Sequence, residues 1–239
     1  MQMRFMAAAF TALGGRETNQ DSAHADPRLL VVADGVGGAP AGEVASAVAV
    51  RAVVDAGPDT DPALLAERAN SAVVAHAEAD PATAGMATTV DIAALVPGPA
   101  GWEVRGAHVG DSFTLVQTDR VTRLGRAHTL AEELVAGGHI TPEEGARHPN
   151  RSALMRAVGM GPTVEPELWS HPAAPGTRYL LSSDGLFDAL GMEAVVTLLD
   201  SLRPSPPADV ARMLVESACA AGARDNVTVV VAEVTPWQG

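Results

Sequence analysis

The sequence of 239 residues contains no lysine, so all 16 of its basic residues are arginine. Lysine is needed by the Walker-A phosphate loop, by protein kinases and by enzymes that form Schiff bases, and its absence excludes all three. Cysteine is almost absent as well: Cys219 is the only one and has no internal disulfide partner. A single cysteine is typical of a reducing compartment, so we expect a cytoplasmic protein.

Aromatic residues make up only 3% of the chain, so a core drawn from its 47% hydrophobic residues must be mostly alanine, valine and leucine. The net charge of −13 argues against nucleic acid or an anionic membrane as a partner, and it suits cation binding. No run approaches the roughly 18 apolar residues of a membrane span. Residues 1–13 loosely resemble a signal peptide, but they are short for one, and we interpret them as a first core strand.

The hydrophobic periodicity predicts strands joined by short turns, with helices between some of them. Helices are expected at residues 43–56 and from residue 61 or 62 to about 79, side by side on one face of a sheet. Strands are expected at 29–33, 88–96, 102–109, 113–117, 121–124, 178–183 and 226–234, and 21–28 is expected to be a polar loop. Short connections between consecutive strands indicate an antiparallel meander.

Residues 125–166 interrupt this strand pattern and are interpreted as a helical flap, with helical pieces at 129–136, at a capped segment from Thr141 and at 150–158. Two more helices, at about 191–202 and 208–221, precede the last strand. The chain shows no internal repeat, low-complexity tract or clear linker. We therefore expect residues 1–239 to form a single domain.

Aspartates recur where predicted strands begin or end, next to glycine in three of the four cases: Asp34, Asp111, Asp184 and Asp225. A single Asp-Gly pair is more often a turn than a ligand. Four strand-end carboxylates brought together would repel by several kcal/mol at an effective dielectric constant of about 20, unless cations lie between them. All-oxygen ligands favour Mg²⁺ or Mn²⁺ over zinc.

With these motifs the chain resembles the metal-dependent (type 2C, PPM) protein serine/threonine phosphatases, most closely the bacterial single-domain members. The resemblance covers nearly the whole chain in order, at residues 16–21 (RETNQD), 34–38 (DGVGG), 42–46 (GEVAS), 85–89 (GMATT), 108–112 (HVGDS), 140–144 (ITPEE), 182–186 (SSDGL) and 225–228 (DNVT). It implies an α+β fold in which two antiparallel β-sheets pack as a sandwich flanked by α-helices, in four αββα layers with a helical flap insertion.

The resemblance also assigns metal ligands residue by residue. Asp34 is expected to bridge two metal ions, Mn²⁺ or Mg²⁺. Asp184 and Asp225 would complete the coordination of one ion, while Asp21 and the Gly35 carbonyl would contribute to that of the other. Two cations about 3.5–4 Å apart lower the pKa of a shared water, so that hydroxide can attack phosphorus in line.

Two further positions complete the implied site. Asp111 matches a position that helps to hold a third, weaker ion in bacterial members. Arg16 matches the arginine that grips the substrate phosphate, a task that suits its planar, bidentate guanidinium. As an alternative, Arg16 is a surface arginine or a helix-capping partner.

The chain departs from the family pattern at three positions. Val36 stands where animal members often have a histidine, proposed there as the proton donor to the leaving oxygen. Phe113 replaces the arginine that commonly follows Gly-Asp-Ser, and the segment 126–129 lacks the acid often found before its histidine. The seven histidines share no metal-ligand spacing.

The resemblance therefore implies a phosphatase that acts on phosphoserine or phosphothreonine in proteins, with the substrates of bacterial serine/threonine kinases as its expected targets. Two other hypotheses stay open. One is a catalytically silent scaffold of the same fold that binds phosphoproteins, and the other is a metal-dependent hydrolase of small phosphoesters. Asn226 is expected to be structural, pinning the loop of Asp225.

Overall fold

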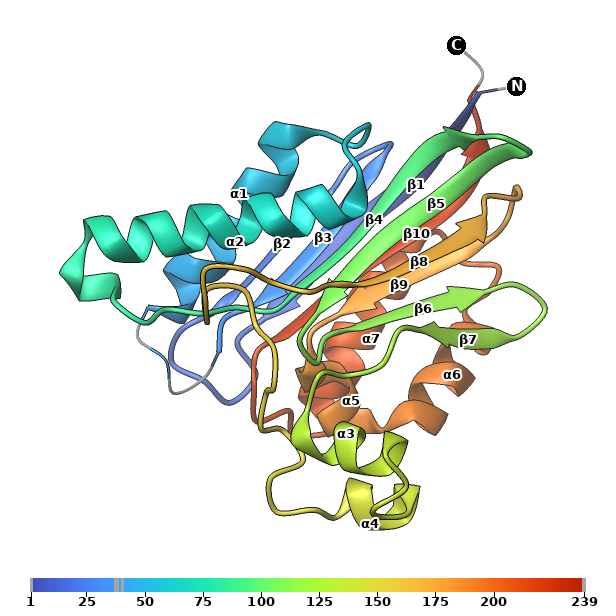
Figure 1. Cartoon of the computed structure of the whole chain (residues 1–239). Helices are drawn as coiled ribbons and strands as arrows, with labels where there is room; N and C mark the ends of the chain where they lie inside the picture. The colour runs from blue at the N-terminus through green and yellow to red at the C-terminus, as the bar shows by residue number, and fades with distance from the viewer. Residues whose placement is uncertain (1, 37–38, 40, 238–239) are drawn as a thin grey trace.

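The computed structural model describes residues 2–36, 39 and 41–237, in which two five-stranded antiparallel sheets pack face to face (Figure 1). One sheet has the order β1-β10-β9-β6-β7, from β1 (Met3–Ala12), β10 (Val227–Pro236), β9 (Arg178–Ser182), β6 (Phe113–Gln117) and β7 (Val121–Leu124). The other has the order β2-β3-β4-β5-β8, from β2 (Asp21–Ala25), β3 (Leu29–Asp34), β4 (Val90–Gly98), β5 (Gly101–Val109) and β8 (Glu167–Pro172).

Helices cover both outer faces of this sandwich. The antiparallel pair α1 (Gly42–Ala56) and α2 (Pro62–Ala79), with the short 3₁₀ turn Pro81–Thr83 after it, packs on the sheet that contains β3. On the other sheet lie α5 (Asp184–Leu190), α6 (Met192–Ser201) and α7 (Pro207–Ala220). The predicted four-layer αββα sandwich is confirmed.

The central strands are continuous apolar runs because both of their faces are buried. Along β3, Leu29 and Val31 pack against α1 and α2, whereas Leu30 and Val32 point into the layer between the sheets. Strand β10 divides its side chains in the same way between the α5–α7 layer and the inter-sheet layer. The run of valines predicted as the last strand therefore serves two hydrophobic layers at once.

The segment between β7 and β8, residues 125–166, carries α3 (Leu130–Ala136) and α4 (Pro142–Ala146) and projects from one end of the sandwich (Figure 1). Thr141 and Glu144 form a capping box at α4, as predicted: each side chain accepts a hydrogen bond from the other's backbone N–H. The prediction of helix at residues 150–158 is wrong. That stretch consists of turns, and isolated bridges fix it at Leu154 to Thr129 and at Val158 to Thr88.

Four further elements differ from the sequence prediction. Residues Asp21–Ala25, expected to be loop, form edge strand β2, because pairing with β3 supplies an order that their mixed composition does not. Strand β8 and helix α5 were both missed, since each is short and has no periodic signal of its own. Strand β4 starts at Val90, so Thr88 and Thr89 precede it.

Within the described residues, none of the helices combines the length and the apolar composition that crossing a bilayer requires. The residues Gly37 and Gly38 of the 34–38 motif lie outside the described part of the chain.

Candidate active site

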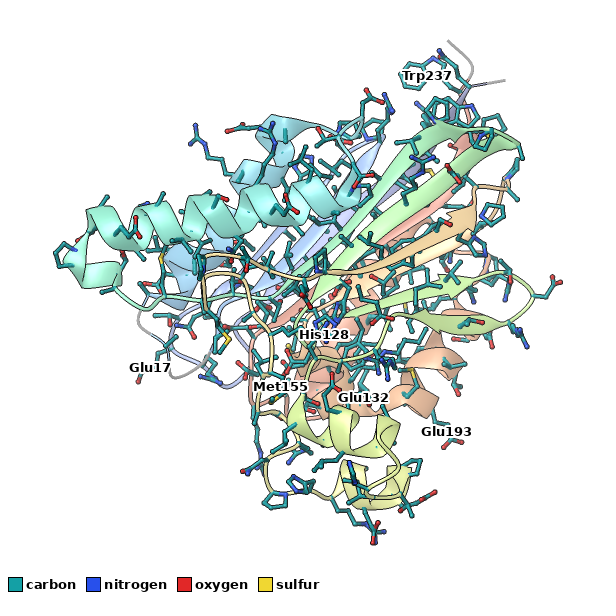
Figure 2. All side chains as sticks on the ribbon, viewed as in Figure 1. Glu17, His128, Glu132, Met155, Glu193 and Trp237 are labelled. Carbon is teal, nitrogen blue, oxygen red and sulfur yellow. The ribbon has the colours of Figure 1, made fainter. Side chains whose placement is uncertain are left out.

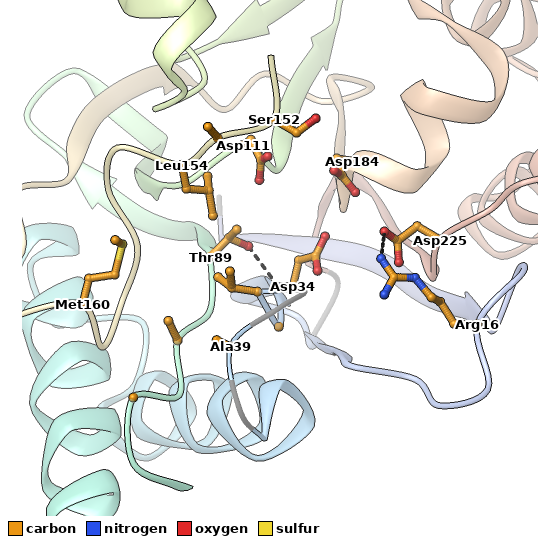
Figure 3. A pocket seen from close by; sticks show the side chains of 15 residues that line it. Arg16, Asp34, Ala39, Thr89, Asp111, Ser152, Leu154, Met160, Asp184 and Asp225 are labelled. Atoms are coloured by element: carbon orange, nitrogen blue, oxygen red, sulfur yellow. Dashed lines mark hydrogen bonds and ion pairs between the residues drawn. The ribbon is translucent and has the colours of Figure 1, made fainter. Parts of the chain in front are cut away.

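A cavity of about 470 Å³ lies where strand ends of both sheets meet the segment 125–166 (Figure 3). Residues 152–154 and Met160 of that segment border it, together with residues from both sheets. Six of the seven residues singled out from the sequence line this cavity, namely Arg16, Asp34, Gly35, Asp111, Asp184 and Asp225. Positions up to 209 residues apart in the chain, Arg16 and Asp225, thus come into direct contact.

Asp34 ends β3, and two threonines hold its backbone in place. The Asp34 N–H donates to Thr89 Oγ1 at 2.9 Å, and the Asp34 carbonyl accepts from the Thr89 N–H at 2.8 Å and from Thr88 Oγ1 at 2.8 Å. The sequence pattern predicts both threonines to be strand residues, and this role was missed. Their place as the last two residues of the GMATT motif was the available signal, because a polar pair directly before a buried strand needs partners of its own.

Asp21, the seventh residue, lies beside the cavity and faces Asp34. The two are cross-strand partners in the β2–β3 register. Ser183 Oγ donates to Asp21 Oδ2 at 2.8 Å, and the Thr228 N–H donates to the same Ser183 Oγ at 3.0 Å. The other carboxylate oxygen, Asp21 Oδ1, is buried and has no hydrogen-bond partner within the described residues. A buried, unpartnered carboxylate oxygen is costly unless a cation binds it.

Gly35 and Gly185, which follow Asp34 and Asp184, are needed because other backbone segments approach them closely. A Cβ on Gly35 would lie 2.5 Å from the Gly42 carbonyl group, at the start of α1. A Cβ on Gly185 would collide with the Asn226 carbonyl oxygen. The Asp-Gly pairs therefore allow the strand ends that carry the carboxylates to pack against neighbouring backbone.

Asp225 and Arg16 form an ion pair, with Arg16 Nη2 at 2.6 Å from Asp225 Oδ2 (Figure 3). The next residue, Asn226, fixes this part of the chain. Its Nδ2 donates to the carbonyls of Leu13 and Thr18 at 3.0 and 2.9 Å, and its Oδ1 accepts from the Gln20 N–H at 2.9 Å. Asn226 thus ties the loop that carries Arg16 to the head of β10, as the sequence indicated.

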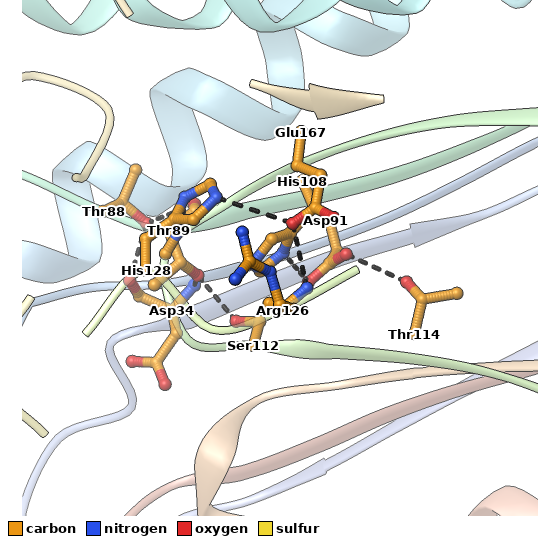
Figure 4. A network of polar contacts seen from close by, with 11 residues as sticks. Asp34, Thr88, Thr89, Asp91, His108, Ser112, Thr114, Arg126, His128 and Glu167 are labelled. Atoms are coloured by element: carbon orange, nitrogen blue, oxygen red, sulfur yellow. Dashed lines mark hydrogen bonds and ion pairs between the residues drawn. The ribbon is translucent and has the colours of Figure 1, made fainter. Parts of the chain in front are cut away.

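The loop of Asp111 rests on a buried polar network (Figure 4). Gly110, directly before Asp111, donates from its N–H to His128 Nδ1 at 3.2 Å and accepts from the His128 N–H at 2.7 Å. The His128 ring packs against that of His108, with centroids 4.8 Å apart. Directly after Asp111, the Ser112 hydroxyl bonds with Thr89 Oγ1 at 2.7 Å. Both neighbours of Asp111 are therefore held by buried groups.

His108 continues this network into the sheet. Its Nδ1 lies 3.1 Å from Asp91 Oδ2, and the Thr114 hydroxyl donates to Asp91 Oδ1 at 2.9 Å (Figure 4). Burial together with the nearby cations of the network lowers the pKa of His128 to about 4, so its Nδ1 is free to accept the Gly110 N–H. These histidines support the loop from outside the cavity and do not line it.

The carboxylates repel one another and resist ionisation. Burial, followed by the charges of Asp21 and Asp184, raises the pKa of Asp34 well above its ordinary range. Burial and then the charge of Asp111 raise the pKa of Asp184 to about 8. Burial raises the pKa of Asp111 to about 6 and also raises that of Asp21. A site that forces acids together at this cost is suited to cations.

The donor set fits hard divalent cations. Every candidate donor is an oxygen, and Asp21 Oδ1 is buried with no other partner among the described residues. Within the same residues no three acidic, histidine or cysteine side chains meet closely enough to enclose one ion by themselves. An all-oxygen donor set is the one that Mg²⁺ and Mn²⁺ prefer.

Comparison with known proteins accounts for this arrangement. Residues 13–217 match the family described as Protein phosphatase 2C. The chain belongs to this family. The serine/threonine protein phosphatase PstP of Mycobacterium tuberculosis is 41% identical to it over 232 residues, which cover 93% of this chain and 43% of that protein. The serine/threonine phosphatase stp of Listeria innocua is 35% identical over 218 residues, covering 86% of this chain and 84% of that protein.

Solved structures of the protein phosphatase 2C family share the fold. The crystal structure of M. tuberculosis PstP/Ppp superimposes with a TM-score of 0.86 at 37% identity, covering 96% of this chain and 98% of that one. The PstP catalytic domain in complex with two manganese ions gives a TM-score of 0.84 at 36% identity, covering 98% and 100% of the two chains. This chain therefore matches the catalytic domain of PstP but spans less than half of the full protein.

Proposed function

We propose that this protein is a metal-dependent serine/threonine protein phosphatase, which hydrolyses phosphoserine and phosphothreonine through a water activated by two divalent cations. The observation that carries the proposal is the convergence on one cavity of Asp34, Asp111, Asp184 and Asp225 with a single arginine, Arg16. Family membership and the names of the relatives support the same reaction.

Five groups are proposed to hold the cations, Mn²⁺ or Mg²⁺. Asp34 would contact both ions, Asp184 and Asp225 would serve one, and Asp21 and the Gly35 carbonyl would serve the other. Two such cations would supply an activated water near neutral pH and would stabilise the charge that develops on the phosphoryl oxygens. The PstP catalytic domain, determined with two manganese ions, supports the number and kind of these ions. Asp111 is proposed to help to hold a third, weaker ion.

Arg16 is proposed to bind the phosphate of the substrate. Its side chain is 43% exposed, so a phosphate in the cavity can reach the guanidinium while Asp225 Oδ2 keeps Nη2 in place. The ion pair orients the planar fork before the substrate arrives, which lowers the entropic cost of binding. Bidentate contact would then hold the phosphoryl group in line with the attacking water.

The leaving oxygen of serine or threonine needs a proton. None of the described residues that line the cavity is a histidine, and Val36 lines it where animal relatives often carry one. We propose that solvent water supplies this proton, since the Arg16 and Asp225 side chains on the cavity wall are 43% and 38% exposed and so are in contact with solvent.

The proposed substrates are phosphorylated proteins, in keeping with the names of the relatives, and among them the targets of bacterial serine/threonine kinases. The single cysteine fits a reducing compartment, so we propose that the protein acts in the cytoplasm. We also propose that residues 1–239 form one catalytic domain, because strands of both sheets contribute to a shared inter-sheet core.

The test is the release of phosphate from a phosphothreonine peptide with Mn²⁺, by the wild-type protein and by the Asp34→Ala and Asp184→Ala variants. We expect turnover by the wild type and a loss of at least about a thousand-fold in each variant, since removing even one transition-state-stabilising group costs about 10²–10³ in kcat. Equal rates in all three would exclude the metal mechanism. Binding without turnover would favour the scaffold, and faster turnover of sugar phosphates would favour a small-molecule phosphatase.

A further inference from the structure

A second cavity of about 450 Å³ opens beside the catalytic cavity. The two share three lining residues, Asp111, Ser152 and Asp184, so they are contiguous. We call the second one the flap-side cavity, because α3 and α4 of the segment 125–166 form one of its walls. A polypeptide segment bound in the catalytic cavity therefore lies next to the flap-side cavity.

The wall formed by the segment 125–166 is mostly apolar. Ala131 and Val135 come from α3, and Pro142, Gly145 and Ala146 come from α4. The two helices pack tightly here, since a Cβ on Gly145 would lie 2.6 Å from Val135 Cγ2. This wall is thus a small-residue surface of defined shape, which leaves room for a guest side chain.

A second part of the lining is aromatic. Phe113, the first residue of β6, and Phe187, on α5, have ring centroids 4.3 Å apart. The Arg123 guanidinium carbon lies 4.1 Å from the Phe113 ring centroid, and Arg123 Nη2 is buried without a hydrogen-bond partner among the described residues. Arg123 therefore covers part of the Phe113 ring and keeps one unpartnered donor among the described residues, while the aromatic pair supplies the apolar surface of this part of the lining.

The charged residues that belong to this cavity alone balance one another. Arg123 and Arg151 are matched by Glu132 and Asp188. The two further acids of the lining, Asp111 and Asp184, are shared with the catalytic cavity and are proposed to bind cations there, so apolar contact is the interaction that this cavity itself adds. A buried apolar side chain gains about 1.5–3 kcal/mol relative to an exposed one.

We propose that the flap-side cavity is a specificity subsite that binds a large hydrophobic side chain of the substrate polypeptide, within a few residues of the phosphorylated serine or threonine. The inference rests on the proposed phosphatase function. An extended peptide advances about 3.3 Å per residue, so a neighbour of the phosphorylated residue reaches the adjoining cavity. The Phe113–Phe187 pair and the small residues of α3 and α4 would pack against the guest side chain.

The test compares phosphothreonine peptides in sets of three. Within a set, one position near the phosphothreonine carries phenylalanine, alanine or aspartate. Each position on either side of the phosphothreonine is varied in turn in this way. The enzymes are the wild type, Phe113→Arg, Phe187→Ala and the apolar replacement Phe113→Leu. Trp237→Ala is the matched control, because Trp237 also carries an arginine on its ring, Arg4 at 5.4 Å, and lies at the far end of the molecule (Figure 2). Hydrolysis of p-nitrophenyl phosphate, which is too small to fill both cavities, reports on the chemistry separately.

We expect the wild type and Trp237→Ala to favour the phenylalanine peptide over the alanine peptide in kcat/KM by roughly ten- to a hundred-fold, the value of one buried side chain. The preference should persist in Phe113→Leu, fall in Phe187→Ala, and shift towards the aspartate peptide in Phe113→Arg. The subsite is disproved, while the phosphatase function stands, if the wild type cleaves p-nitrophenyl phosphate and its kcat/KM is the same for the three peptides at every position.

A binding measurement keeps the two proposals separable. Calorimetry with non-hydrolysable phosphonate versions of the same peptides measures the preference without turnover. A protein that cleaves nothing but still binds the phenylalanine peptide more tightly would overturn the phosphatase proposal and keep the subsite. Equal affinity for the phenylalanine and alanine versions at every position would overturn the subsite, whatever the activity.

Discussion

Asp21 and Asp34 stand directly opposite each other in the antiparallel pair of β2 and β3, and they form its last residue pair at the cavity end. Like charges at opposed positions of two strands destabilise a sheet. The structure adds to this repulsion, because Asp184 and Asp111 also face Asp34. Strand pairing, which stabilises the fold, thus brings these acids together. Cations can neutralise the cluster while its carboxylates stay ionised.

The first prediction is that Asp184→Asn stabilises the protein in EDTA while it abolishes phosphatase activity. Asparagine removes a carboxyl group whose ionisation in this site is opposed by burial and by Asp111. We expect the free energy of unfolding to rise by about 0.5–2 kcal/mol at pH 8, which is typical when strain at a functional site is relieved. Thermal unfolding in EDTA measures it, and a variant less stable than the wild type at pH 8 would refute the repulsion.

The second prediction concerns pH. The pKa of Asp184 is about 8 in the folded protein, against an ordinary value of 3.8. The folded state therefore holds a proton that the unfolded state has released, so stability in EDTA falls as the pH rises from about 4 to about 8. Saturating Mn²⁺ should remove most of this slope. The check is the unfolding temperature across this range with EDTA and with Mn²⁺, and parallel curves would count against a cation at the carboxylates.

The third prediction is that Arg16→Ala lowers kcat/KM for a phosphopeptide by about 10²–10³, the usual effect of losing one preorganised donor at a developing charge. Arg16→Lys should recover little, because an ammonium cannot make the bidentate contact. Arg224→Ala is the control, since Arg224 is exposed and does not line the cavity. Similar losses in Arg16→Ala and Arg224→Ala would show that only overall charge matters.

The fourth prediction is that Gly185→Ala impairs activity through its effect on backbone packing. Its Cβ would push against the Asn226 carbonyl and move Asp184 away from Asp225. Overpacking of this kind costs about 1–3 kcal/mol, and a displacement of about 1 Å can lower the rate about a hundred-fold. Gly161→Ala is the matched control, because its Cβ would meet nothing closer than 3.9 Å. Stability and kcat are measured for both variants, and an unaffected Gly185→Ala would contradict the packing argument.

The fifth prediction is that Asn226→Ala weakens the site from a distance. It removes three hydrogen bonds that link the head of β10 to residues 13, 18 and 20. Each buried group left without a partner costs about 1–3 kcal/mol, so we expect a clear loss in the free energy of unfolding. Because Arg16 lies in the loop that is released, KM for the phosphopeptide should rise as well. Urea unfolding and steady-state kinetics test the two effects together.

Some elements could be predicted from sequence for a clear physical reason. Strands such as β3 and β10 are apolar throughout because each is buried on two faces, and this leaves a strong local signal. The cap of α4 was equally readable, since Thr141 and Glu144 have the spacing of a capping box. The strand-end aspartates were recognisable because their neighbouring glycines and their order match one family.

Other features depend on partners far along the chain. Strand β2 has the composition of a loop and becomes ordered only through its pairing with β3. The bonds from Thr88 and Thr89 to Asp34, and from His128 to Gly110, join segments that no local pattern connects. Cys219 lies in α7 with an exposed side chain. The flap-side cavity likewise exists only once α3, α4 and α5 are assembled.

The most direct test of the central claim is a calorimetric titration of Mn²⁺ into the wild-type protein and into Asp34→Asn at pH 7.5. The account predicts at least two Mn²⁺ ions per wild-type chain and the loss of both from the variant, because Asp34 is placed in contact with each. Equal binding by the two proteins, or no binding by the wild type, would contradict it.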